Sequence, residues 1–142
     1  MSELDTLIRL HRWQLDEKRR ALADLQALAD RLEEDKARLE AEVSREQEAA
    51  RNSADVAFSY AGFAQVAIER RRRLEQSVAQ IHAQIAVATD EVADAFQELK
   101  RYELAQEGRD RRERQRRSRR EGILLDEVAV TGYLRRRPDA QG

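Results

Sequence analysis

The chain has 142 residues, of which 39% are charged and 5% are aromatic, and its formal net charge is −1. This composition is too polar for a layered globular core and is typical of long helices or of disordered chains. The small net charge gives the chain as a whole no attraction to polyanions, and the lack of cysteine excludes disulfides and thiolate metal sites.

The first predicted element is a long helix over about residues 3–51. Neither glycine nor proline occurs before Gly62, and strong helix formers dominate this region. Alternating steps of four and three residues from Leu4 give fourteen positions, of which ten are apolar. Sustained over seven heptads, this spacing predicts a seam that one other helix covers. The seam positions are Leu4, Ile8, His11, Leu15, Lys18, Leu22, Leu25, Ala29, Leu32, Lys36, Leu39, Val43, Glu46 and Ala50.

A turn is predicted next, at about residues 52–62, within the stretch NSADVAFSYAGF. Asn52, Ser53, Asp55 and Ser59 are residues that cap helices or form turns, and Gly62 can adopt a positive φ. A reversal centred near residue 54 would place Leu4 opposite roughly residue 104, because both helices rise by about 1.5 Å per residue.

A second helix is predicted over about residues 63–121 or beyond. The same stepping from Leu74 to Tyr102 gives nine positions, and all nine are apolar. Continued further, it reaches Gln106, Arg109, Glu113, Arg116 and Arg120, where no apolar side chain remains. The prediction is therefore an all-α fold, a long antiparallel two-helix coiled-coil hairpin whose second helix extends past the first. Residues 1–135 would form this single domain, and residues 136–142 a disordered tail.

The segment RDRRERQRRSRRE, residues 109–121, contains eight arginines and three acidic residues, so its local charge is +5. Such a segment can bind nucleic acid through salt-sensitive phosphate contacts. It lacks interleaved aromatic residues and carries intervening acids, which favours instead a solvated helix or an acidic groove of a protein. The apolar stretch GILLDEVAV follows, and a single helix cannot bury that surface, so another molecule is expected to cover it.

No enzyme is predicted, and no cofactor. The chain has no glycine-rich phosphate loop, no nucleophile elbow and no dinucleotide fingerprint. His11 and His82 would lie far apart along the hairpin, which argues against a metal site. The N-terminal stretch has no apolar run long enough for a signal peptide or a membrane span. A cytoplasmic protein without membrane insertion is therefore expected.

Several apolar residues lie outside the two seams. Leu7, Leu10 and Trp13 cluster near one end of the predicted hairpin, and we expect Leu7 and Leu10 to contribute to packing. A second group near the turn either thickens the tip or forms a contact patch for other proteins. This group comprises Phe58, Tyr60, Phe63, Val66 and Ile68.

With these features together, the chain resembles the FliJ family of flagellar type III export proteins over nearly its whole length. The resemblance rests on the opening LIRLHRWQLDEKRRALADL, on FSYAGF near the turn, on the basic run, and on LDEVA at residues 125–129. Other members often have a lysine- or glutamine-rich stretch where this chain is almost wholly arginine. The resemblance implies a central stalk of the flagellar export ATPase, comparable to the γ stalk of rotary ATP synthases, that also acts as an export chaperone.

The resemblance also implies partners and binding residues. The paired ends would enter the flagellar export ATPase hexamer, while the tip would reach the membrane-embedded export gate protein or substrate chaperones, with no small-molecule substrate. The expected ATPase-binding residues are Arg109, Arg112, Arg116, Arg119, Arg120, Leu124, Leu125, Asp126 and Glu127. The expected gate-binding or chaperone-binding residues are Phe58, Tyr60, Phe63 and Val66.

Two other functions remain compatible with the sequence. The arginine-rich helix could serve a nucleic-acid-binding coiled coil, or the seams could pair between chains in a self-associating structural coiled coil. A gel-shift titration in salt distinguishes the first alternative and sedimentation distinguishes the second.

Overall fold

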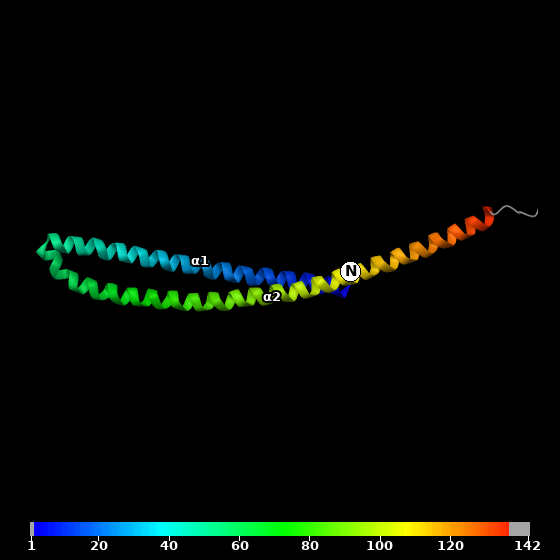
Figure 1. Ribbon diagram of the computed structural model, residues 1–142. Helices are drawn as coiled ribbons and strands as arrows, with labels where there is room; N and C mark the ends of the chain where they lie inside the picture. The colour runs from blue at the N-terminus through cyan, green and yellow to red at the C-terminus, as the bar shows by residue number, and fades with distance from the viewer. Residues whose placement is uncertain (1, 137–142) are drawn as a thin grey trace, which may run out of the picture. The chain divides into compact units, whose positions relative to one another are not determined.

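The protein consists of two helices in a computed structural model that describes residues 2–136. Helix α1 spans Glu3–Asn52 and helix α2 spans Ala54–Arg136 (Figure 1). Within residues 2–136 only Ser2 and Ser53 lie outside a helix. The predicted all-α helical hairpin with a longer second helix is confirmed. The tail predicted to start at residue 136 differs, because Arg136 still belongs to α2, and residues 137–142 lie outside the described part.

The reversal between the helices is much shorter than predicted. Ser53 alone separates α1 from α2, so the turn expected at residues 52–62 and the helix start near residue 63 were both wrong. The Ser53 carbonyl accepts a hydrogen bond from the Ala57 amide at 3.0 Å, as an N-cap residue does. Gly62 lies inside α2, and no described glycine has a positive φ.

By its internal contacts the chain divides into two units, which are described separately. The first, which we call the hairpin unit, comprises residues 10–98. Here α1 and α2 run antiparallel and side by side. Lys18 pairs with Glu91 at 2.9 Å, and Arg71 pairs with Glu40 at 3.6 Å. In each pair, one residue precedes Asp55 and the other follows it by nearly the same number of positions. The register between the two helices is therefore close to the predicted one.

The core of the hairpin unit lies along the predicted seams. Its buried residues come from both helices and have exposed fractions below 10%. They are Leu15, Ala29, Leu39, Ala67, Ile81 and Ala88. Among the predicted first-seam positions of this unit only Lys18 is exposed, and its ammonium group reaches Glu91 at the edge of the seam. The second seam begins earlier than predicted, at Tyr60, because the helix already exists there.

The second unit, which we call the arm unit, comprises residues 2–9 and 99–136 of the described chain. Ile8 and Leu99 are its buried residues. Ser2 and Asp5 cap the start of α1 reciprocally: the Ser2 amide donates to Asp5 Oδ2 at 3.1 Å, and the Asp5 amide donates to Ser2 Oγ at 3.2 Å. The Gln106 side-chain amide also donates to the Asp5 carboxylate. Beyond Gln106, α2 has no buried side chain in the described part.

Candidate protein-binding surfaces

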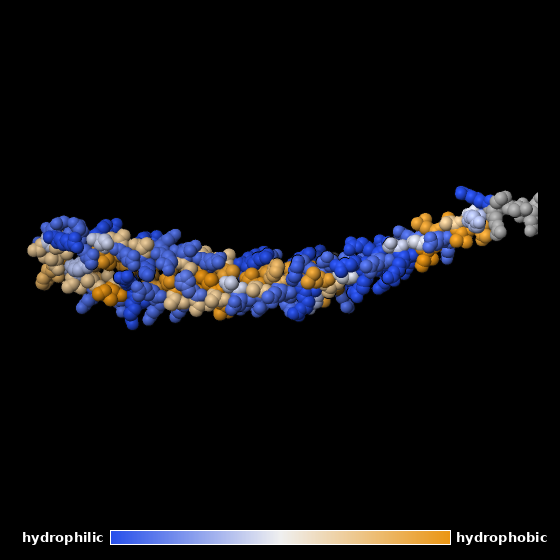
Figure 2. Space-filling view, in the orientation of Figure 1, coloured by the Kyte–Doolittle hydropathy of each residue, from blue (hydrophilic) through white to orange (hydrophobic). Residues whose placement is uncertain are grey.

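The first candidate surface is the arm, which we define as residues 107–136 of α2. All of its side chains are exposed, because the segment is helical without any neighbouring element in its unit. The arginines predicted to bind the ATPase lie within it and are exposed: Arg109, Arg112, Arg116, Arg119 and Arg120. Figure 2 shows the arginine segment of the arm in blue and the apolar cluster that follows it in orange.

Most of the positive charge of the arm is not neutralised internally. Within residues 107–136, Arg111 lies 3.7 Å from Glu107 and Arg116 lies 4.0 Å from Glu113, both long distances for an ion pair. No further ion pair occurs in this part of the structure, so the remaining guanidinium groups face water. Arginine is well suited to pair with carboxylates because its planar fork can donate two parallel hydrogen bonds.

The arm ends in an apolar cluster, which we call the apolar end and define as residues 123–134. Its large side chains have exposed fractions of 58–68%. These residues are Ile123, Leu124, Leu125, Val128, Val130, Tyr133 and Leu134. A helix turns by about 100° per residue. Ile123 and Val130 therefore share one side, Leu124 points to another side, and Leu125 points to a third. A helix that is apolar on all sides needs a partner that surrounds it.

The apolar end continues the heptad pattern of the paired part of α2. Steps of four and three from Tyr102 reach Ile123, Glu127, Val130 and Leu134 after the charged interval. The sequence prediction followed this pattern only as far as Arg120. It therefore left part of the apolar end out of the binding set, namely Ile123, Val128, Val130, Tyr133 and Leu134. Following the same stepping past the arginines would have found three of these five.

Asp126 and Glu127, also predicted to bind the ATPase, lie in the middle of the apolar end. Both side chains are exposed, and neither makes an ion pair within the described residues. They are adjacent in sequence and so point about 100° apart around the helix. A partner that surrounds the apolar end must therefore leave these two carboxylates in water or supply positive groups for them.

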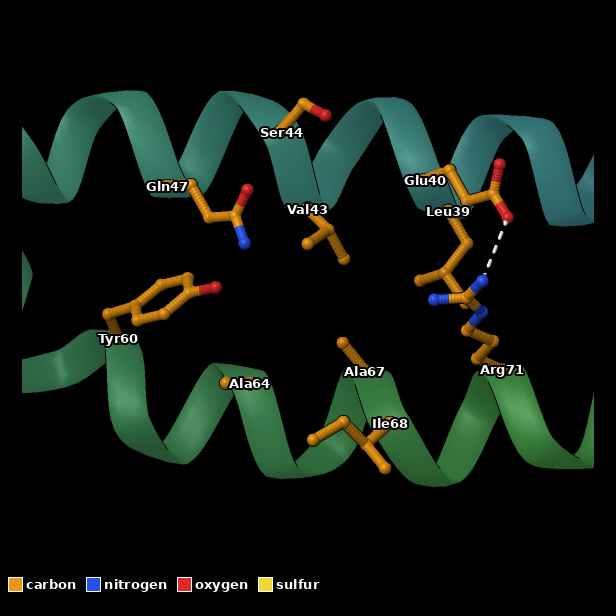
Figure 3. A pocket seen from close by; sticks show the side chains of 10 residues that line it. All are labelled: Leu39, Glu40, Val43, Ser44, Gln47, Tyr60, Ala64, Ala67, Ile68 and Arg71. Atoms are coloured by element: carbon orange, nitrogen blue, oxygen red, sulfur yellow. Dashed lines mark ion pairs between the residues drawn. The ribbon is translucent and has the colours of Figure 1, made fainter.

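The second candidate surface lies beside the turn, in the hairpin unit. A groove of about 400 Å³ runs between α1 and α2, and in Figure 3 Tyr60 and Gln47 extend toward it. The Glu40–Arg71 ion pair closes one side of it at 3.6 Å. Its other lining residues are mainly apolar or small: Leu39, Val43, Ser44, Ala64, Ala67 and Ile68.

The four residues predicted to bind the gate or chaperones do not form one surface. Tyr60 and Phe63 are half-buried and close together, with ring centroids 6.2 Å apart. Phe58 is 90% exposed and makes no ring contact within the described residues. Val66 lines a separate hollow with Gln65, Glu69, Arg70 and Arg73, away from the groove that Tyr60 lines.

The apolar residues near the start of α1 do not pack as expected. Leu7 is 38% exposed in the arm unit, and Leu10 is 45% exposed in the hairpin unit. The prediction that these two leucines contribute to packing was wrong, because one partner helix covers only the seam positions of α1. Trp13 is also exposed.

Residues 2–136 contain neither a cluster of metal-binding side chains nor a helix that could span a membrane. No group of three or more histidine, cysteine, aspartate or glutamate side chains is arranged to hold a metal ion in this range. Neither of the two described helices contains a stretch that is apolar enough, over a sufficient length, to span a bilayer.

Paired helices and an exposed arm define a coiled-coil hairpin protein, a class that acts through contacts with other macromolecules. A family model described as "Flagellar FliJ protein" matches residues 1–138 of the 142 residues. The chain therefore belongs to the FliJ family, as its sequence predicted. This family is a non-catalytic component of flagellum biogenesis and flagellar protein export. Comparison with curated proteins and with solved structures gave no match.

Proposed function

We propose that this chain is the central stalk of the flagellar export ATPase. In this role it promotes assembly of the ATPase ring, links the ring to the export gate, and acts as an export chaperone. It carries out no catalysis itself. It works in the cytoplasm, peripherally attached to the export apparatus, with the ATPase hexamer, the membrane-embedded gate protein and substrate chaperones as partners.

The observation that supports this role best is the distribution of side chains around the arm. A partner lying along one side of the apolar end would leave Leu124 or Leu125 in water if it covered Ile123 and Val130. An enclosing socket, such as the centre of a ring of subunits, covers all sides at once. The exposed arginines that precede the apolar end suit acidic side chains at the entrance of such a socket.

The groove beside the turn supports the second part of the proposal, a contact with the gate or with chaperones. It combines an apolar floor with polar groups at its edges, which is the usual composition of a site for a protein segment. Tyr60 contributes aromatic surface to the groove, and the Phe63 ring lies beside it, with the two ring centroids 6.2 Å apart. Phe58 and Val66 point elsewhere and would serve separate contacts.

ATP hydrolysis by the cognate export ATPase tests the stalk role. We expect the intact chain to raise the hydrolysis rate, and a variant truncated after Gln106 to lose this effect, because the truncation removes the whole arm. Circular dichroism and thermal melting of the truncated variant should show that residues 2–106 remain folded. Equal stimulation by the intact and truncated chains would reject the role assigned to the arm.

The unpaired arginines of the arm also favour one alternative, namely binding to nucleic acid. Phosphate contacts by about five arginines would make the affinity fall steeply with salt concentration. Lack of any gel shift with DNA or RNA at low salt would exclude this alternative. A shift that the truncation after Gln106 abolishes, without any effect of the intact chain on the ATPase, would favour it over the stalk.

A further inference from the structure

The arm is a helix without packing support from the described residues. Before Gln106 the arm unit has buried seam residues, such as Leu99 at 7% exposure. From residue 107 to residue 136 every side chain is exposed. Helices in proteins owe most of their stability to the packing of an apolar face rather than to their intrinsic propensity. The arm therefore relies on its own sequence until another molecule covers it.

Three glycines, at positions 108, 122 and 132, weaken that intrinsic stability, and the first two flank the arginine segment. Gly108 and Gly122 are helical, neither has a positive φ, and a Cβ atom at either position would meet nothing within 4 Å. Neither a turn nor a close approach of another group requires glycine there. Glycine is less favourable than alanine in a helix by ~1 kcal/mol. Since about 1.4 kcal/mol corresponds to a factor of ten, each glycine lowers the equilibrium constant for helix formation by about fivefold.

Repulsion between arginines weakens the helix further. Arg112, Arg116 and Arg120 are spaced four residues apart and so lie along one side of α2. Like charges at this spacing destabilise a helix, and the nearest acid to Arg116, Glu113, is 4.0 Å away. Acidic side chains of a partner would remove this repulsion when they approach the arm.

We propose that the arm folds and docks in one coupled step. In the free chain its helix opens readily between Gly108 and the end of α2, and the helical form becomes stable when an acidic, apolar-lined partner surrounds it. This inference rests on the proposed stalk function and adds its regulation. Part of the free energy of the contacts is used to order the arm. The complex therefore has a lower affinity and a faster dissociation rate than the same contacts would give with an arm that is already helical.

Hydrogen–deuterium exchange with mass spectrometry tests the first half of this proposal. In the intact free chain, peptides from residues 109–136 should exchange within seconds, while peptides containing Leu15 and Ile81 remain protected. Added export ATPase should protect the arm peptides. Arm peptides as protected as the Leu15 peptide in the free chain would overturn the proposal.

Substitution of Gly108 and Gly122, the glycines that flank the arginine segment, tests the second half. The variants Gly108→Ala and Gly122→Ala should slow exchange of the arm in the free chain and tighten ATPase binding by up to about fivefold each. Gly62→Ala makes the same change within the hairpin unit and should leave the affinity unchanged. Unchanged or weaker binding by the arm variants would contradict the coupling.

The failure of this inference and the failure of the stalk function are distinguishable. If the ATPase does not bind the intact chain at all, the stalk function fails. Even in that case, hydrogen–deuterium exchange of the arm in the free chain still decides whether the arm helix is open without a partner. Slower exchange in the Gly108→Ala and Gly122→Ala variants would support the same conclusion. If the ATPase binds and the arm is already protected when free, only the coupling fails.

Discussion

At the scale of single residues, the seam positions carry the stability of the hairpin unit. Leu15 is 3% exposed and Leu10 is 45% exposed, although both are leucines in the same helix. The difference follows from helical geometry, because Leu15 falls on the heptad seam that faces α2 and Leu10 does not. The Lys18–Glu91 ion pair contributes less, since about half of each side chain is exposed and exposed pairs are worth about 0–1 kcal/mol.

This difference gives a prediction for two matched substitutions. Leu15→Ala should lower the free energy of unfolding by about 2–3 kcal/mol, because it removes buried methyl groups and leaves a cavity. Leu10→Ala should change it by less than about 1 kcal/mol. Chemical denaturation monitored by circular dichroism measures both values. Similar losses for the two variants would show that the seam assigned here is incorrect.

The capping of α1 by Asp5 gives a prediction for acid pH. The pKa of Asp5 lies below its ordinary value of 3.8, first because of the backbone hydrogen bond from Ser2, then because of the Ser2 hydroxyl and Gln106. Since the pKa is lowered in the folded chain, the stabilisation is present above pH 3.8 and is lost as the pH falls below that value. Amide exchange in the first turn should therefore increase at pH 3, relative to the pH trend of the hairpin unit. Asp5→Ala should exchange fast at both pH values.

At the scale of elements, the boundary between α1 and α2 shows where local signals mislead. Asn52, Asp55, Ser59 and Gly62 all favour a long turn by propensity. The chain uses only Ser53 for the reversal, because a single N-cap lets both helices continue. Ala64 and Ala67 then join the seam, which extends the paired region toward the turn.

Gly62→Ala tests this assignment. Gly62 is inside α2, has no positive φ, and a Cβ atom there would meet nothing within 4 Å. The substitution should therefore raise the free energy of unfolding by up to about 1 kcal/mol and raise the melting temperature. If Gly62 were a turn residue with positive φ, its substitution by alanine would lower the stability instead of raising it. A lower melting temperature would therefore contradict the helical position of Gly62.

At the scale of the whole molecule, the pairing partner of α1 decides the oligomeric state. The Lys18–Glu91 and Glu40–Arg71 pairs join the two helices within one chain. Two copies of the chain could pair in parallel through their apolar ends. This arrangement would bring their arginine segments together, and the like charges would repel each other. Self-association through the arm is therefore disfavoured at low salt.

Sedimentation equilibrium of the intact chain tests this point. We expect a single species with the monomer mass of 16.5 kDa at micromolar concentrations. The variant truncated after Gln106 should also be monomeric. A dimer that persists after truncation would indicate pairing of seams between chains, and would favour the self-associating structural coiled coil over the stalk.

The sequence by itself determined the helical fold, the two seams and the exposed arginines, because a heptad pattern is a local property that repeats along the chain. It also indicated the arm as a surface that needs a partner, although the apolar stretch it named did not extend to Leu134. The tertiary structure alone decided the position of the reversal at Ser53, and with it which flanking apolar residues are covered. Tyr60 became half-buried and Phe58 stayed exposed because the register between two distant segments, rather than any local propensity, sets what each side chain faces.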